Sequence, residues 1–403
     1  MISLQHYKLL FRAPNVAPAV LASVIGRIPM SITGLAILLL VQSKAGSFAL
    51  AGVVSALYVL GLAVLAPFLG RLIDRVGPKP VLSMSAVMYP AALIALVLLV
   101  TQSAQSFWIA TCAAVAGAAM PPITVCMRAL YPQLLKEDKL LQTAYSLDSA
   151  LIEMIFILGP NLVAAFVAMH YTQGAMLFAA ACAPLGSFVF LRSPAIKRWK
   201  LHAADPRRSL LGPLHDPRLL AIFIATALYS AAFGLFEVGV TGFATHRGAP
   251  AAAGVILGLA SVGSALGVLM YGSRDWVLPV TKQFLLALAA MAAGILLVVP
   301  VSNLYGFTVV AIIGCAPMSV VLAATSTLIS KMASRAMLAE SFTWMATCLL
   351  AGISAGIAAG GILVEHFSAT PVFLAAAAVT GIAGMIAALK LSARSLQPVS
   401  GET

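Results

Sequence analysis

Charged side chains are scarce in this sequence, because Asp, Glu, Lys and Arg make up 9% of its 403 residues while 62% are hydrophobic. A soluble domain has about 25% charged residues and could not cover so much apolar surface. The composition therefore excludes a soluble globular protein and indicates an integral membrane protein. Alternating segments of about ten residues, which mark an outer-membrane barrel, are also missing, so the predicted fold class is all-α.

Cysteine is rare and the common catalytic motifs are absent. The five cysteines all fall within apolar stretches and none has metal-ligand spacing. No HExxH, GxSxG or GxxxxGK[ST] pattern occurs, which argues against a hydrolase and against direct drive by ATP. We therefore predict a protein that is not an enzyme and has no metal site and no cofactor.

What the chain has instead is a series of long apolar runs. Each is about 20 residues, enough for a helix to cross roughly 30 Å of hydrocarbon. We predict twelve spans, at 17–42, 48–70, 81–100, 107–128, 145–168, 174–191, 219–244, 251–272, 283–300, 306–329, 341–364 and 371–390.

The basic residues are distributed unevenly across this map. All but three of the 24 Lys and Arg residues fall on one side; Lys44 and Arg247 lie on the other, and Arg27 lies within a span. By the positive-inside rule the basic side, with both termini, is cytoplasmic. The net charge of +12 thus reflects topology, and we expect no nucleic-acid partner. We expect a monomer without a cleaved signal in the cell membrane, the inner membrane of a bacterium.

A basic, proline-containing segment divides the chain. We predict a six-span N-terminal half at 1–191, a cytoplasmic linker at 192–218 and a six-span C-terminal half at 219–403. A weak repeat supports the division, since Gly, Arg and Asp end the second span of each half, as Gly272, Arg274 and Asp275 in the second. Parallel repeats of this kind place a substrate path between them.

The segment after the second span carries the most informative motif, and we predict a loop there. It reads Gly70-Arg71-Leu72-Ile73-Asp74-Arg75-Val76-Gly77-Pro78-Lys79. It resembles the signature Gly-x-Leu-Ala-Asp-Arg-x-Gly-Arg-Lys/Arg of the major facilitator superfamily, from which Ile73 and Pro78 depart. With the span map and the linker, the resemblance covers essentially the whole chain. It implies twelve helices in two pseudo-symmetric six-helix bundles, and a transporter of the drug-efflux-like branch.

The resemblance also implies a role for this motif. In the family, the equivalent of Asp74 holds the start of the eleventh helix, here 339–341, and lets go when the cytoplasmic side opens. The candidate gating residues are Gly70, Asp74, Arg75, Gly77 and Lys79. The alternative is that the charges only anchor the topology.

Two further patterns are incomplete. The span 145–168 has Gly159-Pro160 without the following glycine pair of many exporters, and the eleventh span has Gly352, Gly356 and Gly360 at every fourth position. We interpret the glycines as packing positions or as a hinge. Proton antiporters of the family often have an Arg four residues before a Gly in the fourth span. Here that position is Ala113, which puts the arginine relay in doubt.

Ionisable residues inside spans are costly and therefore candidates for function. Arg27, Glu153 and Glu237 lie well inside, and Asp148 and Arg128 lie nearer the cytoplasmic ends of their spans. We predict that Arg27 pairs with Glu153 or Asp148, either as a structural ion pair or as a cavity site for an anionic ligand. Glu237 has no obvious cationic partner, which makes it the candidate for proton coupling or else a group in a wet cavity.

Aromatic and polar residues in the same spans are candidates for the cavity wall. They are Tyr58, Tyr145, Asn161, Tyr229, Phe236 and Trp344. We expect a secondary transporter driven by an ion gradient, protons in the first instance, that exports a small amphipathic molecule. An ion-coupled importer of a metabolite is the alternative, and a membrane receptor or scaffold without transport is another.

Overall fold

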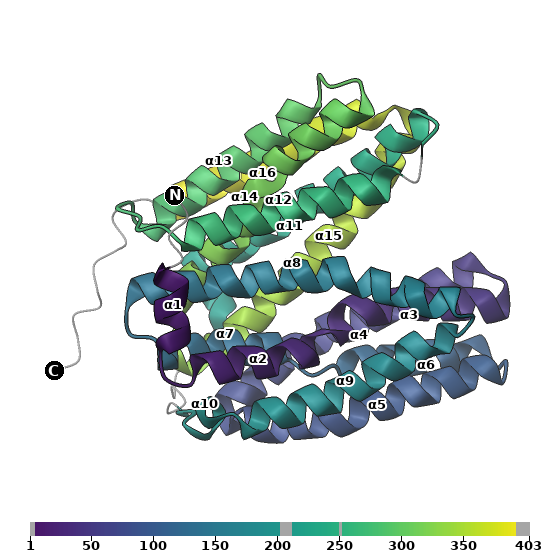
Figure 1. Cartoon of the computed structure of the whole chain (residues 1–403), viewed down its shortest axis with the longest axis horizontal. Helices are drawn as coiled ribbons and strands as arrows, with labels where there is room; N and C mark the ends of the chain where they lie inside the picture. The colour runs from purple at the N-terminus through teal and green to yellow at the C-terminus, as the bar shows by residue number, and fades with distance from the viewer. Residues whose placement is uncertain (1–4, 202–211, 250–251, 392–403) are drawn as a thin grey trace. The chain divides into compact units, whose positions relative to one another are not determined.

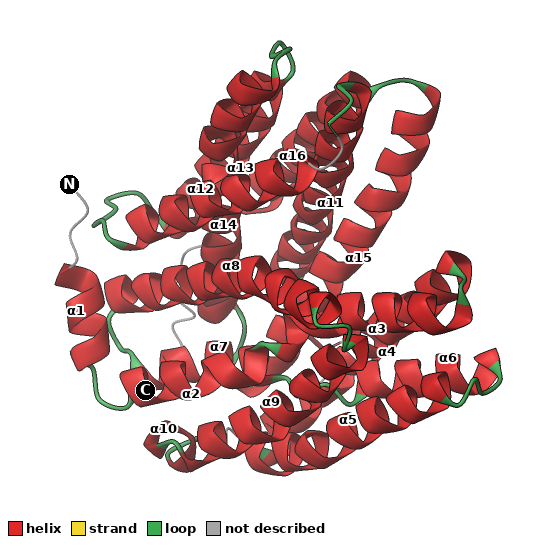
Figure 2. Ribbon diagram, turned by 45° about the vertical axis from the view of Figure 1, so that its right-hand side comes forward, coloured by secondary structure: helices red, strands yellow, loops and turns green. Residues whose placement is uncertain are grey.

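The structure is a computed structural model that describes residues 5–201, 212–249 and 252–391. In these ranges every regular element is a helix, as Figure 2 shows. The helices of the first half are α1 (Gln5–Arg12), α2 (Val16–Arg27), α3 (Pro29–Ala45), α4 (Phe48–Val76), α5 (Pro78–Thr101), α6 (Ser106–Ala118), α7 (Ile123–Leu134), α8 (Asp138–Ala168), α9 (Thr172–Arg192) and α10 (Pro194–Lys197). The later ones are η1 (Gly212–His215), α11 (Pro217–His246), α12 (Ala252–Gly272), α13 (Val280–Val298), α14 (Leu304–Met332), η2 (Arg335–Met337), α15 (Leu338–His366) and α16 (Ala369–Leu391) (Figure 1).

Twelve segments of the described chain are long and apolar enough to cross a membrane, from Val16–Lys44 to Ala369–Leu391. This confirms the predicted all-α fold and the number of spans. Two spans are broken. The first divides into α2 and α3 at Ile28-Pro29, and the fourth into α6 and α7 at 119–122, where Pro121 and Pro122 lie. Proline supplies no backbone N–H and its ring crowds the preceding turn, so helices restart there.

The chain forms two compact units. The first comprises Met1–Arg208 with two short segments of the second half, Leu269–Arg274 and Ser334–Thr347. The second comprises Ser209–Val268, Asp275–Ala333 and Cys348–Thr403. The end of α12 and the start of α15 therefore belong to the first unit. Residues 202–211 of the predicted linker lie outside the described residues.

The core of the first unit is built from the apolar faces of α3, α4, α5, α6 and α9. Ile37, Tyr89 and Ala113 are among its fully buried members. The hydroxyl groups in this core are hydrogen-bonded, since Thr33 Oγ1 and Tyr89 Oη are 2.7 Å apart. An unbonded hydroxyl would be costly at this depth, so these pairings stabilise the bundle.

The second unit is held by aromatic stacking and by small residues. The rings of Phe243 and Phe307 stack with centroids 4.2 Å apart, and Phe236 packs on Phe373. The glycine stripe of α15 faces α11: a Cβ at Gly356 would overlap the carbonyl group of Ala231. This contact supports the packing interpretation of the stripe, because only glycine allows the two backbones to come so close.

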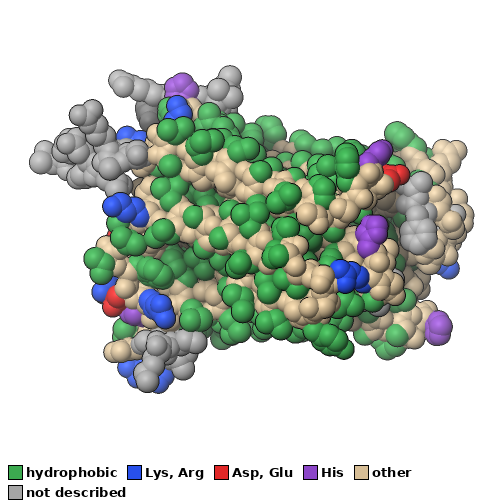
Figure 3. Space-filling view, turned by 90° about the horizontal axis from the view of Figure 1, so that it is seen from above, with side chains coloured by type: hydrophobic (Ala, Val, Ile, Leu, Met, Phe, Trp, Pro, Cys, Tyr) green, Lys and Arg blue, Asp and Glu red, His purple; other side chains and the backbone are tan. Residues whose placement is uncertain are grey.

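The flanks of the helices are apolar where they are exposed. Figure 3 shows hydrophobic side chains along the helices, with Lys, Arg, Asp and Glu toward their ends. Leu21, Val87 and Leu389 are among the exposed large hydrophobic residues. Such a surface would be unfavourable in water and suits a lipid environment.

Candidate functional site

The signature segment is mostly helical. Residues 70–76 form the last turns of α4, and Pro78 and Lys79 begin α5. The predicted ten-residue loop is therefore wrong, and the turn is confined to Gly77, whose φ of 85° favours glycine. The helix continues because Ile73 extends its buried face and no residue breaks it before Gly77. Arg71 and Asp74 therefore lie one turn apart on a rigid element.

Asp74 caps the start of another helix. Its Oδ1 accepts a hydrogen bond from Ala339 N at 3.0 Å and its Oδ2 accepts one from Glu340 N at 2.9 Å. Both N–H groups belong to the first turn of α15, where no carbonyl within the helix is available. The positive end of the helix dipole adds to the attraction. The contact with 339–341 that the family resemblance implies is therefore present, while its gating role stays a prediction.

Arg71 adds an ion pair that the sequence analysis missed. Its Nε and Nη2 lie 3.1 and 2.6 Å from Glu340 Oε1, and the Glu340 side chain is fully buried. We refer to the contacts of Arg71 and Asp74 with Ala339 and Glu340 as the clasp. Gly70 allows this approach, because a Cβ there would overlap Thr343 and the carbonyl oxygen of Ala339. The available signal was Glu340 itself, an isolated acidic residue at the beginning of a span.

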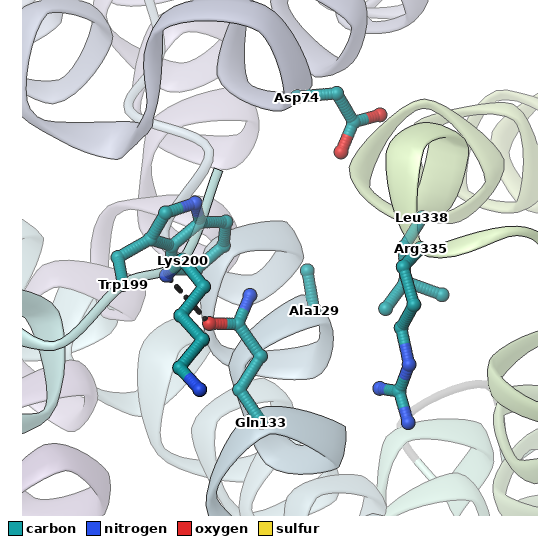
Figure 4. A pocket seen from close by; sticks show the side chains of 7 residues that line it. All are labelled: Asp74, Ala129, Gln133, Trp199, Lys200, Arg335 and Leu338. Atoms are coloured by element: carbon teal, nitrogen blue, oxygen red, sulfur yellow. Dashed lines mark hydrogen bonds between the residues drawn. The ribbon is translucent and has the colours of Figure 1, made fainter. Parts of the chain in front are cut away.

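The other charges of the motif lie differently. Arg75 and Lys79 are exposed, which suits the topology-anchor interpretation for these two. Beside the clasp is a small hollow, which Trp199 and Lys200 line on one side and Arg335 and Leu338 on the other (Figure 4). Lys200 closes one side of it by donating its backbone N–H to Gln133 Oε1 at 3.0 Å. Asp74 also lines this hollow.

A second contact holds the end of α12. Tyr7 Oη donates to Leu269 O at 2.9 Å, Thr143 Oγ1 donates to Gly272 O at 2.8 Å, and His6 Nδ1 lies 2.9 Å from Ser273 O. Leu269 O also accepts from Ser273 N at 3.1 Å, so Tyr7 adds a second bond to it, while Gly272 and Ser273 lie at the end of the helix, where carbonyls lack partners within the helix. Burial raises the pKa of Tyr7 above its usual range, so the hydroxyl remains a donor. The repeat at Gly272 is thus held through its carbonyls, whereas the clasp uses a carboxylate.

Three buried ionisable residues meet in the first unit. Arg128 Nε donates to Asp148 Oδ2 at 2.7 Å, and Arg27 Nη1 lies 2.6 Å from Asp148 Oδ1 without the alignment of a hydrogen bond. We refer to Arg27, Arg128 and Asp148 as the buried cluster. Of the two partners considered for Arg27, Asp148 is the neighbour. Glu153 is five residues further along α8, which turns it about 140° around the helix.

Arg128 is the functional candidate that the sequence analysis left aside, because it lies near the end of its span. It joins the cluster because α7 is a separate helix that restarts after Pro122. In the fourth span, the position at which proton antiporters of the family often have an arginine is the buried Ala113. Four residues later, Gly117 lies against the backbone of Tyr58. Gly159 allows α8 to contact Ser31.

Glu237 is half-buried on α11 in the second unit. No ion pair is recorded for its carboxylate in the part of the chain that the structure describes. Its backbone carbonyl accepts from Thr241 Oγ1 at 3.0 Å. Its role in coupling stays a prediction.

The cavity candidates have different surroundings. Tyr58 and Tyr145 are buried and hydrogen-bonded, Tyr58 Oη to Met120 Sδ at 3.4 Å and Tyr145 Oη to Arg128 O at 3.0 Å. Asn161 is exposed and donates to Ile157 O. The other three are largely buried: Tyr229, Phe236 and Trp344. Their contact with a solute stays a prediction.

A comparison with protein-family models gives one match, to the Major Facilitator Superfamily, over residues 19–316. The chain belongs to this superfamily. Membership over most of the chain indicates a transporter rather than an enzyme. The match is to the superfamily as a whole, so the assignment to its drug-efflux-like branch stays a proposal. A comparison with curated proteins finds no match.

Solved structures of this superfamily's fold resemble the chain at low identity. A bacterial homologue of the iron transporter ferroportin in its outward-facing state has a TM-score of 0.79 and 14% identity, over 94% of this chain and 99% of that one. The human organic anion transporter MFSD10 (TETRAN) has a TM-score of 0.73 and 15% identity, over 93% of this chain and 99% of that one. The E. coli fucose:proton symporter FucP has a TM-score of 0.72 and 13% identity, also over 93% of this chain and 99% of that one. All three share the fold of this chain.

Proposed function

We propose that the protein is a secondary active transporter that works by alternating access and exports an amphipathic compound in exchange for protons. The clasp is the observation that carries the proposal. It joins two helices far apart in sequence through two hydrogen bonds and one ion pair. Hydrogen bonds to charged groups contribute about 1.5–3 kcal/mol each, so the clasp has the strength of a reversible switch.

Other features support the direction of transport and the class of cargo. Export is favoured by the Gly159-Pro160 pair and by the likeness of the motif to drug-efflux-like members. An amphipathic cargo is favoured by apolar and aromatic cavity candidates such as Phe236 and Trp344. Proton coupling is assigned to Glu237, since a carboxylate in a span without a cationic partner can exchange its charge for a proton.

The orientation is tested directly by fusion. We expect reporters fused after Lys44 and after Lys79 to report opposite sides of the membrane, with Lys79 cytoplasmic, because the basic residues gather on one side. Alkaline phosphatase and green fluorescent protein serve as the paired reporters. Reports from the same side for both fusions would overturn the span map.

Transport is tested with purified protein in proteoliposomes. A set of amphipathic fluorescent dyes is supplied with an imposed pH gradient, and then without a gradient but with unlabelled dye on the far side. A proton-coupled carrier accumulates dye in the first assay and exchanges it in the second. Exchange without accumulation under a pH gradient would argue against protons, and failure of both assays across the dye set would contradict the proposal.

Glu237→Gln separates coupling from binding. We expect proton-driven accumulation to fall by about tenfold or more while exchange persists, because glutamine keeps the shape of the side chain but cannot take up a proton. The control is Glu365→Gln, an exposed glutamate at the end of α15, which should change neither assay. Equal loss of accumulation and exchange in Glu237→Gln would place this residue in binding or structure instead.

A further inference from the structure

The buried cluster has more cationic donors than acceptors. Two guanidinium groups face one carboxylate, which leaves one excess positive charge when all three are ionised. Nε and Nη2 of Arg27 and Nη2 of Arg128 are buried and have no hydrogen-bond partner among the residues that the structure describes. An unsatisfied buried polar group costs about 1–3 kcal/mol, and more when charged. Such a cluster calls for an explanation beyond packing.

The two arginines are not equivalent. Arg128 is aligned with Asp148 through Nε, so the carboxylate already has a hydrogen-bonded partner. Arg27 has only the unaligned contact with Asp148, and none of its three nitrogens makes a hydrogen bond within the described chain. Nε and Nη2 of Arg27, part of the fork of donors that matches a carboxylate or phosphate, therefore remain unused, while Nη1 is paired with Asp148.

Arg27 also lies where two helices are broken. It is the last residue of α2 before the break at Ile28-Pro29. A Cβ on its neighbour Gly26 would overlap Ile123, the first residue of α7 after the second break. Broken membrane helices in transporters recur where a solute or ion binds, because the interrupted backbone and nearby side chains then have free polar groups.

A group of aromatic rings connects the cluster to the first turns of α15. Tyr145 donates to the carbonyl of Arg128, its ring lies 5.9 Å from that of Phe342, and the ring of Tyr131 meets it edge-on at 5.5 Å. Phe342 belongs to the same first turns of α15 as Ala339 and Glu340. A displacement of the start of α15 would carry Phe342 with it and remove the ring that lies beside Tyr145.

We propose that Arg27 binds an oxyanion group of the transported solute, a carboxylate or a phosphate, and that release of the clasp uncovers it. The inference rests on the proposed transport function and names its substrate class as an amphipathic anion. Asp148 stays with Arg128 as the structural pair, and the incoming anion balances the excess charge at Arg27.

The first test is chemical access to Arg27 in the full-length protein in detergent. Phenylglyoxal, which modifies arginine, is applied to wild type and to Asp74→Asn, and modified peptides are quantified by mass spectrometry. We expect Arg27 to react several-fold more in Asp74→Asn, while the exposed Arg247 reacts equally in both. Equal reactivity of Arg27 in both proteins would overturn the coupling of the cluster to the clasp.

The second test is protection in Asp74→Asn with matched probes. 1-Naphthoate represents the anionic group on an apolar solute, 1-naphthamide is its neutral match, and inorganic phosphate represents a free oxyanion. We expect 1-naphthoate to protect Arg27 and 1-naphthamide to fail. Protection by phosphate as well would extend the site to free oxyanions. Equal protection by acid and amide, or no protection by either oxyanion, would refute the proposal.

A third measurement separates a binding role from a structural one. If Arg27 has a structural role, Arg27→Gln should lower the melting temperature. If Arg27 binds the ligand, the melting temperature of Arg27→Gln without ligand should be unchanged or higher, because the substitution removes the excess buried charge. Stabilisation by 1-naphthoate should be lost in Arg27→Gln, with affinity weaker by about 10- to 100-fold, and partly kept in Arg27→Lys. Binding without transport would refute the proposed function alone, and transport of the acid and the amide alike would refute only this inference.

Discussion

Asp74→Asn should reduce transport about tenfold or more while the protein still inserts in the membrane. The change keeps the size of the side chain but removes the charge that faces the first turn of α15, and one of its two acceptor oxygens becomes a donor. Losing a charge-assisted hydrogen bond and the dipole attraction together costs about 2–4 kcal/mol. That cost shifts a two-state equilibrium about 30- to 1,000-fold away from the clasped state.

The measurement is the initial rate in proteoliposomes, with membrane insertion checked by surface labelling of a single engineered cysteine. Asp216→Asn is the matched control, since Asp216 is the partly exposed N-cap of α11 and its side chain accepts from Arg218 N. Asparagine is also a good N-cap, so this variant should transport normally. If Asp74→Asn also transported at the wild-type rate, the motif would be a topology signal only.

The ion pair of the clasp should contribute less than Asp74 does. Arg71 is 25% exposed, so solvent screens its attraction to Glu340, and the pair is attached to the same turn that Asp74 already holds. This difference gives Asp74 the larger predicted effect. It also explains why the motif carries an aspartate at a fixed place, since its two oxygens match two adjacent N–H groups.

The spans could be predicted from sequence because the membrane imposes length and hydropathy on each helix separately. The end of α4 could not, because the charges of residues 70–79 are typical of a loop, whereas the fold buries Ile73 and the segment remains helical up to Gly77. The Arg71–Glu340 ion pair could not be predicted for the same reason, because it depends on which helix begins beside α4. Local patterns do not contain this information.

The buried cluster shows the same limit in another form. Charges inside spans identified Arg27 and Asp148 as candidates, since burial of a charge is costly wherever it occurs. The choice between Asp148 and Glu153 depends on the rotation of α8, and the inclusion of Arg128 depends on the break before α7. Both are results of packing, so sequence reasoning found the components of the site and left their pairing open.

Asp148→Ala should be the most destabilising single substitution in the first unit. It leaves Arg27 and Arg128 buried with no counter-charge, and breaking a buried ion pair by removing one partner costs about 3–5 kcal/mol. We expect a lower melting temperature and lower yield of monodisperse protein by fluorescence-detected size-exclusion chromatography. Asp138→Ala is the control, because Asp138 is exposed at the start of the same helix and its loss should cost about 1 kcal/mol or less.

A double variant shows whether charge or shape is responsible. Asp148→Asn with Arg128→Gln removes one charge of each sign and returns the cluster to the excess of one positive charge that the native protein has. It should therefore be more stable than Asp148→Asn alone. If the single variants were as stable as wild type, the cluster would be hydrated rather than dry. Arg27 would then have water as its partner, and the excess charge would no longer argue for an anionic solute.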